Sequence, residues 1–238
     1  MRQFTARIVR LNALANGHVL AAVAGPLPGG HAAGQFYLAL PAERNQSAHH
    51  YLRLPLFLES FGPDGMTIEL PPDLTYLSPG DELDLAGPCG RGLILPERAR
   101  NVLLIAGPAG PARLRPIADS ALARRALIVL YSETPQSLDG LSPEIEARFG
   151  PAHLSEAVGW ADAIYADLER SALSDLQRRL RDGAANGEWP TLPLAFALLK
   201  PPMPCGVGAC LACAVFTSHG WKLACADGPF FDLLDLEL

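Results

Sequence analysis

The sequence predicts a multi-domain α+β protein, with an antiparallel β-barrel first, then an α/β domain built on a parallel sheet, then a small cysteine-rich lobe. Three observations predict this order. Short strands separated by Pro/Gly turns fill residues 1–97, strands alternate with helices in residues 98–188, and four of the five cysteines lie in residues 189–238. We take these three ranges as the expected domains.

Length and composition indicate an ordered protein with sizeable cores. The chain has 238 residues, of which 49% are hydrophobic and 18% charged, and its net charge is −6. No run of Lys or Arg is long enough to bind phosphates, so nucleic acid and anionic membranes are not expected as partners. Glycines and prolines interrupt the uncharged segment 11–42, and the amino terminus lacks an apolar leader. We therefore expect no membrane span and a reducing, cytoplasmic location.

Six strands are predicted in the first domain. Polar and apolar residues alternate in them, and turn sequences such as Ser78-Pro79-Gly80-Asp81 separate them. The strands are expected at residues 4–11, 18–24, 35–40, 51–58, 66–70 and 82–86. Six short strands with such turns indicate a small antiparallel barrel.

The second domain begins with an apolar run at residues 102–106, which is typical of a strand buried on both faces. Further strands are expected at 126–131 and 162–166, and an extended apolar segment at 193–199. Helices are expected at 112–125, at 142–150 and at 171–181. Ser142-Pro143-Glu144 would cap the second helix, and Gly183 would end the third. The alternation predicts a parallel sheet with right-handed crossovers.

The last domain carries Cys205, Cys210, Cys213 and Cys225, separated by four, two and eleven residues. A C-x4-C-x2-C run with a later fourth cysteine is the spacing of a plant-type loop that holds a [2Fe-2S] cluster. Gly206 and Gly208 allow positive φ, so that backbone N–H groups can approach a negatively charged cluster. We therefore expect the four cysteines to be cluster ligands.

Other interpretations of the cysteines are less favoured. Structural zinc sites usually carry two short C-x2-4-C pairs, whereas here eleven residues separate the last two cysteines. Disulfides would require an oxidising compartment. Cys89, far from the others in sequence, is expected to be a small buried residue.

The segments 203–213 and 222–230, the second reading K-L-A-C-A-D-G-P-F, closely resemble one family. They are similar to the cluster-binding end of the electron transfer subunit of NAD-dependent dihydroorotate dehydrogenase, a flavoprotein of the ferredoxin reductase class. That family carries M-x-C-G-x-G-x-C-x-x-C and a final C-x-D-G-P. The resemblance covers about thirty residues by motif and most of the chain by architecture.

The resemblance implies a partner and a pathway. In the family, an FMN-bearing catalytic subunit oxidises dihydroorotate to orotate in pyrimidine biosynthesis, and electrons pass through the cluster and FAD to NAD. It thus implies a hetero-oligomer with such a flavoprotein, or a homodimer, and an electron transfer subunit with no catalytic residues of its own. The alternatives are a diverged paralogue without NAD reactivity, with or without FAD, that serves another redox partner, and a non-catalytic metal-binding scaffold.

The resemblance also implies FAD-contacting positions in two stretches. The family's R-P-F-S strand corresponds to residues 52–58, where Leu54 stands at the arginine position and Phe57 at the serine position. Its G-P-L-G-x-G-F segment corresponds to residues 87–93, which could equally be a tight turn. The candidate FAD residues are Arg53, Pro55, Gly87, Pro88, Gly90 and Gly92. FAD binding stays open, because Arg53 would reach the pyrophosphate only after a one-residue slip that turns it to the other face of the strand.

The nicotinamide motifs of the family are altered here. Its G-G-x-G-x-A-P turn corresponds to residues 107–112, where Pro108 and Pro111 supply no N–H donors for a phosphate. Its later C-G-P corresponds to Ala166-Asp167-Leu168, and Asp167 would repel a dinucleotide. We therefore expect direct reaction with NAD to be impaired or absent.

Overall fold

The computed structural model describes residues 1–14, 17–26, 31–41, 52–62, 65–93, 95–189 and 193–238. The chain divides into two compact units. The barrel unit comprises Met1–Leu93, Lys200–Val215 and Lys222–Pro229, and the sheet unit comprises Ile94–Leu199, Phe216–Trp221 and Phe230–Leu238. All four clustered cysteines belong to the barrel unit. The three domain boundaries drawn from the sequence stay a prediction.

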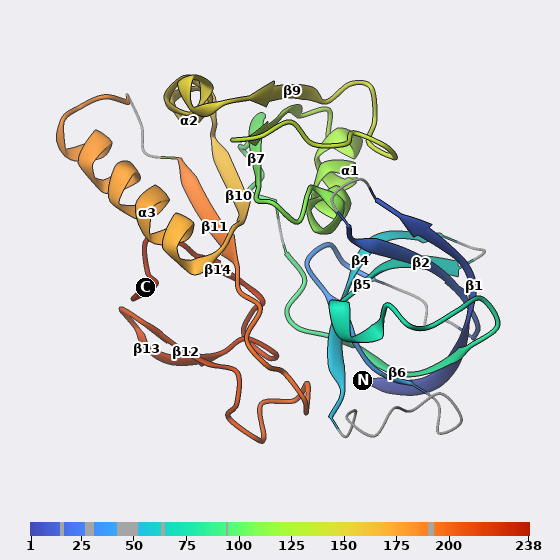
Figure 1. Cartoon of the computed structure of the whole chain (residues 1–238). Helices are drawn as coiled ribbons and strands as arrows, with labels where there is room; N and C mark the ends of the chain where they lie inside the picture. Colours follow the sequence, from blue (N-terminus) through green and yellow to red (C-terminus); the bar gives the residue numbers. More distant parts are fainter. Residues whose placement is uncertain (15–16, 27–30, 42–51, 63–64, 94, 190–192) are drawn as a thin grey trace. The chain divides into compact units, whose positions relative to one another are not determined.

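Six strands close into a barrel in the order β1-β2-β5-β4-β3-β6, with antiparallel neighbours (Figure 1). Their bounds are Arg2–Ala13, Val19–Ala24, Phe36–Pro41, Leu54–Gly62, Gly65–Leu70 and Glu82–Cys89 for β1 to β6, with a short 3-10 helix, η2, at Pro72–Leu74. Alternate side chains such as Ala6 and Ile8 fill the interior, as the period of a strand requires. The six predicted strands are confirmed, although β4 ends four residues later than expected and residue 51 lies outside the described part.

The sheet unit contains a six-stranded sheet in the order β14-β11-β10-β7-β8-β9. Its strands are β7 (Asn101–Ala106), β8 (Leu127–Ser132), β9 (Glu146–Phe149), β10 (Ala163–Asp167), β11 (Leu194–Leu198) and β14 (Phe230–Asp232). The strands from β7 to β11 pair in parallel, and β14 pairs antiparallel with β11. Central strand β7 buries five of its six residues, which explains its continuous apolar run.

Helices cover the sheet. They are α1 (Arg115–Ala123), α2 (Leu154–Trp160) and α3 (Arg170–Ala185), with 3-10 turns η3 (Ala112–Leu114) and η4 (Pro151–His153). In Figure 1, α1 and α3 lie on opposite sides of the strands. Helix α3 buries Leu173, Leu176, Leu180 and Gly183, whose spacing places them on one face. The prediction of an α/β domain built on a largely parallel sheet is therefore confirmed.

The helix predicted at residues 142–150 is wrong. Ser142 forms a turn, in which its hydroxyl accepts the N–H of Glu144 at 3.3 Å and its carbonyl accepts the N–H of Ile145 at 3.1 Å. Such local bonds compete with a helix, and the chain then continues as β9 at the edge of the sheet. The helix of this region, α2, begins only after Gly150.

Gly183 does not end α3, contrary to expectation. The helix continues to Ala185, and the following Gly187 has φ +68°. A Cβ on Gly183 would lie 2.4 Å from the Trp189 ring, so the glycine makes room for the buried indole. The residue is thus a packing requirement inside the helix.

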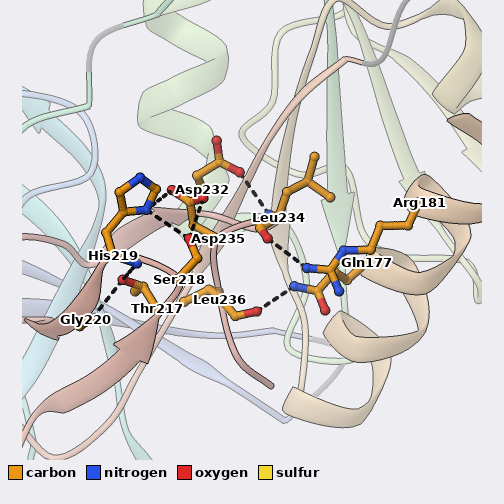
Figure 2. A network of polar contacts seen from close by, with 10 residues as sticks. All are labelled: Gln177, Arg181, Thr217, Ser218, His219, Gly220, Asp232, Leu234, Asp235 and Leu236. Carbon is orange, nitrogen blue, oxygen red and sulfur yellow. Dashed lines mark hydrogen bonds and ion pairs between the residues drawn. The ribbon is translucent and has the colours of Figure 1, made fainter.

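Side chains of α3 bind the segment 233–236, and Figure 2 draws the bonds to Leu234 and Leu236. The amide nitrogen of Gln177 donates to the carbonyls of Leu233, at 2.5 Å, and Leu236, at 2.8 Å. Arg181 donates to the carbonyl of Leu234 at 2.9 Å. These bonds satisfy backbone carbonyls that follow β14 and anchor this segment within the sheet unit.

No helix within the described ranges has the length and apolarity needed to cross a membrane.

Candidate metal centre

A loop and a hairpin bring the four cysteines together in the barrel unit. Cys205 and Cys210 lie in a loop without regular secondary structure, and Cys213 directly precedes β12 (Ala214–Thr217). Strand β13 (Gly220–Leu223) pairs with β12, and the N–H of Ala224 donates to the carbonyl of Cys213 at 3.0 Å. The hairpin therefore returns the chain so that Cys225 lies beside Cys213.

The sulfurs are arranged as two pairs. The Sγ atoms of Cys205 and Cys210 are 3.3 Å apart, and those of Cys213 and Cys225 are 3.2 Å apart. All four are free thiols. Among the described residues, no three Cys, His, Asp or Glu side chains surround a point suitable for one metal ion. Two pairs of neighbouring thiols match the number of protein ligands that the two irons of a [2Fe-2S] cluster take.

Backbone N–H groups of the loop point at these sulfurs. The N–H of Val207 contributes most to lowering the pKa of Cys205 to about 6, and those of Cys210 and Ala209 act in the same direction against the effect of burial. The N–H of Gly208 donates to Sγ of Cys225 at 3.1 Å. Successive N–H groups of this kind form a concavity that stabilises negative charge. The loop therefore suits thiolates and an anionic cluster.

Two glycines give the loop its shape. Gly206 has φ +65° and Gly208 has φ +76°, as the sequence predicted for close approach. The two pairs differ in exposure, because Cys213 and Cys225 are buried whereas Cys210 is exposed. Burial, together with the neighbouring Cys213, raises the pKa of Cys225 to about 12. The pair containing Cys210 is thus the one open to the surroundings.

The C-x-D-G-P segment has a packing role that the spacing of cysteines did not reveal. The Asp227 carboxylate accepts the N–H of Leu223 at 2.8 Å and so holds the turn that follows β13. The carbonyl of Gly228 accepts the N–H of Arg91 at 2.6 Å. A Cβ on Gly90 would lie 2.9 Å from that carbonyl oxygen, so Gly90 permits this contact between the end of β6 and the cysteine segment.

Cys89 lies beneath the cysteine loop. It is buried, as expected, and burial raises the pKa of its thiol to about 11. A Cβ on Gly206 would meet Leu38 and Cys89, so these two barrel residues form the seat of the loop. Neither could be recognised as part of the site from sequence, because β3 and β6 are distant from the loop along the chain.

Five of the six candidate FAD residues, all except Pro88, have close neighbours inside the barrel unit. Arg53 binds Asp84, with 2.8 Å to its carbonyl and 2.5 Å to its carboxylate. Pro55 lies in β4 opposite Leu38, and Pro88 follows Gly87 through a cis peptide bond. A Cβ on Gly87 would lie 2.5 Å from the Tyr37 ring, and one on Gly92 would lie 2.6 Å from Ala32. Close protein packing therefore accounts for these glycines, and their role toward FAD stays a prediction.

At the turn after β7, in the sheet unit, the Gly107 N–H and the nearby Asp167 carboxylate both have partners within the protein. The N–H of Gly107 donates to the carbonyl of Asp167 at 2.9 Å, and Arg113 binds the Asp167 carboxylate at 2.9 Å. That carboxylate is only 1% exposed. An internal ion pair thus lies at the carboxyl ends of β7 and β10, where open α/β sheets usually bind ligands.

Comparison with known proteins agrees with this geometry. Residues 201–237 match the family model described as the iron-sulfur cluster binding domain of dihydroorotate dehydrogenase B. The "Dihydroorotate dehydrogenase B (NAD(+)), electron transfer subunit" of Caldanaerobacter subterraneus subsp. tengcongensis is 28% identical over 204 residues, which cover 76% of this chain and 79% of the relative. The subunit of the same name from Desulforamulus reducens is 27% identical over 182 residues, or 66% of each protein, so that match spans slightly less than two thirds of the relative.

The fold has a known counterpart over nearly its full length. A structure described as the "NADH-dependent reduced ferredoxin-NADP oxidoreductase structure" superposes with a TM-score of 0.78 at 21% identity and covers 98% of this chain and 89% of its own. The predicted fold class and the predicted resemblance to the electron transfer subunits are both confirmed. The match of residues 201–237 to an iron-sulfur cluster binding domain supports an iron-sulfur cluster at the four cysteines.

Proposed function

We propose that this chain, a relative of the dihydroorotate dehydrogenase B electron transfer subunits, transfers single electrons through a [2Fe-2S] cluster bound by Cys205, Cys210, Cys213 and Cys225. The observation that carries the proposal is the arrangement of these thiols as two pairs, with Sγ–Sγ distances of 3.3 and 3.2 Å, facing a row of backbone N–H groups. Such a cluster supplies one-electron chemistry when it is bound.

The four cysteines would hold the cluster, and the two pairs would differ in how far they shield it from water. Cys213 and Cys225 are buried, so they would keep water from one half of the site. Cys205 and Cys210 would face the surroundings and bring the other half near a docking protein. The N–H groups of residues 207–210 would favour the more negatively charged, reduced state and so tune the potential.

The partner we propose is a catalytic flavoprotein subunit that carries FMN and resembles dihydroorotate dehydrogenase, in a cytoplasmic hetero-oligomer. The names of the relatives support it. In that assembly, electrons from the oxidation of dihydroorotate to orotate would leave through this chain. We also propose that the chain has three domains, with boundaries after residues 97 and 188.

The residues at the expected FAD and NAD positions favour a role without NAD, with or without FAD. FAD would fit the fold, but Arg53 is engaged with Asp84 and would have to leave it to bind a pyrophosphate. NAD fits poorly, because Arg113 and Asp167 pair at the expected nicotinamide position. These contacts favour a second candidate function, that of a diverged electron carrier that exchanges electrons with a carrier other than NAD.

The test is the composition of anaerobically purified protein. We expect about two irons and two acid-labile sulfides per chain, a visible spectrum bleached by dithionite, and an electron paramagnetic resonance signal of the reduced state. Cys205→Ser and Cys225→Ser should each lose most of the iron, while the matched Cys89→Ser should keep it. A colourless protein with one zinc and no sulfide would instead establish the scaffold alternative.

A separate measurement tests the nicotinamide part. NADH added to the oxidised, anaerobic protein should leave the visible spectrum unchanged over minutes, whereas dithionite should bleach it. Bleaching by NADH within seconds would overturn the inference about NAD and leave the cluster assignment intact.

A further inference from the structure

A cavity in the sheet unit lies at the carboxyl ends of β7 and β8 and along α3. Its volume is about 670 Å³, within the range of small-molecule sites. Its apolar lining includes Ile105, Leu154, Leu168 and Leu176. A pocket of this size and position is where an open α/β sheet would bind a ligand.

The charge around the cavity is negative. Five carboxylates line it, those of Glu133, Glu169, Asp175, Asp182 and Glu188. Two cations line it, and both are engaged: Arg178 pairs with Asp175, and Arg179 donates to the hydroxyl of Ser155. The formal balance of the lining, two positive against five negative charges, is −3. Such a surface repels phosphates and attracts cations.

The backbone offers little to a phosphate either. The N–H of Gly107 donates to Asp167, the N–H of Gly110 donates to the carbonyl of Gly107 at 3.0 Å, and prolines 108 and 111 have none. Glu169 is the N-cap residue of α3, so the positive end of that helix already has a carboxylate nearby. Both features by which such folds usually bind a pyrophosphate are therefore weakened here.

One residue that lines the cavity has a buried polar group without a hydrogen-bond partner among the described residues. The hydroxyl of Tyr131, a residue that is 2% exposed and lines the cavity, has no hydrogen-bond partner among the described residues. Burial makes the largest contribution to raising the pKa of Tyr131, and the carboxylate of Glu133 raises this pKa further. A buried hydroxyl without a partner is uncommon, and a ligand atom would satisfy it.

We propose that this cavity binds a small organic cation, an amine or guanidinium compound with an apolar body, in place of a pyridine dinucleotide. The apolar body would lie on the leucine and isoleucine side chains, the cationic group would lie among the carboxylates, and the Tyr131 hydroxyl would accept or donate one hydrogen bond. The site is distinct from the cysteine centre, so the proposal does not depend on the cluster.

Calorimetric titration of the full chain with three probes of one shape tests the charge preference. We expect 2-phenylethylamine to bind at least about tenfold more tightly than 3-phenylpropionate, with 2-phenylethanol between them, and NADH to bind more weakly than the amine. The affinity for the amine should decrease as the salt concentration is raised from about 0.05 M to about 0.5 M, because salt screens exposed carboxylates.

Variants separate a ligand site from a structural one. Tyr131→Phe should weaken amine binding severalfold and leave the melting temperature unchanged or higher, since the hydroxyl has no protein partner to lose. Glu133→Gln should weaken binding about threefold. The control Glu97→Gln changes the net charge equally, on an exposed residue outside the cavity, and should have no effect.

Several results would overturn the proposal. They are equal or tighter binding of the propionate or of NADH, an unchanged affinity in Tyr131→Phe, and no saturable binding of the amine up to about 10 mM. Iron and sulfide contents measured on the same sample report on the cysteine centre independently.

Discussion

Gly206 packs against Cys89 so closely that a Cβ on the glycine would lie 2.9 Å from the cysteine sulfur. The same Cβ would lie 2.7 Å from Cδ1 of Leu38, and Gly206 has φ +65°. Strands β3 and β6 of the barrel thus limit how the cysteine loop can be placed. The seat and the loop belong to one compact unit, so a side chain added between them is expected to disturb the metal centre, whereas an exchange of similar size such as Cys89→Ser is not.

Gly206→Ala tests this seat. The side chain would meet Leu38 and Cys89 and would also carry the strain of positive φ, so we expect the loop to shift and the iron content to fall by at least half. The free energy of unfolding should fall by about 2 kcal/mol, of which about 1 is the strain. Iron analysis and urea denaturation measure the two effects.

Gly187→Ala is the matched control for strain alone. Its φ is +68°, and a Cβ there would have nothing within 4 Å. We expect a loss of about 1 kcal/mol in unfolding free energy and an unchanged iron content. Equal iron contents in the two variants would show that crowding at the seat is unimportant.

The bonds made by Gln177 should contribute strongly to stability. Gln177→Leu would leave the carbonyls of Leu233 and Leu236 without this donor in a buried position, at a cost of about 2–3 kcal/mol. Arg178→Gln, which removes an exposed pair with Asp175 on the same helix, should cost less than about 0.5 kcal/mol. Urea denaturation of both variants checks the contrast, and similar losses would refute it.

Gly183→Ala sets helix propensity against packing. Alanine would stabilise a helix interior by about 1 kcal/mol, but its methyl would lie 2.4 Å from the Trp189 ring, and overpacking costs about 1–3 kcal/mol. We therefore expect a net loss of stability. In a Trp189→Leu background the same substitution should be neutral or stabilising, and thermal denaturation of the four proteins measures the coupling.

His31 should make stability depend on pH. It stacks on Phe61 at 5.7 Å between ring centroids, neither of its ring nitrogens has a partner among the described residues, and burial lowers its pKa from 6.5 to about 4. Between these values the unfolded chain binds the proton more readily, so this contribution to stability is complete above pH 6.5 and is lost as the pH falls toward 4.

His31→Phe removes that titration. The unfolding free energy of the wild type should therefore fall more steeply than that of the variant between pH 6.5 and pH 4, measured by urea denaturation. Carboxylates elsewhere affect both proteins equally, so the difference between the two curves isolates the histidine. Parallel curves would contradict the prediction.

Much of the fold could be predicted because it depends on local patterns. Period-two alternation and turn residues located the barrel strands, and the uninterrupted apolar run located β7. The cysteine spacing, with its glycines, identified the iron-sulfur segment, since a metal loop needs fixed residue types at fixed intervals. These features depend on residues that are close together in the sequence.

The sequence by itself determined the order of barrel, parallel sheet and cysteine segment, and the four thiols. Only the tertiary structure decided which thiols pair, that residues 146–149 form an edge strand, and that Arg53 and Asp167 are engaged with Asp84 and Arg113. The physical reason is distance along the chain, because pairing, burial and ion-pair partners are set by residues that meet only after folding, whereas turns and spacing act within a few residues.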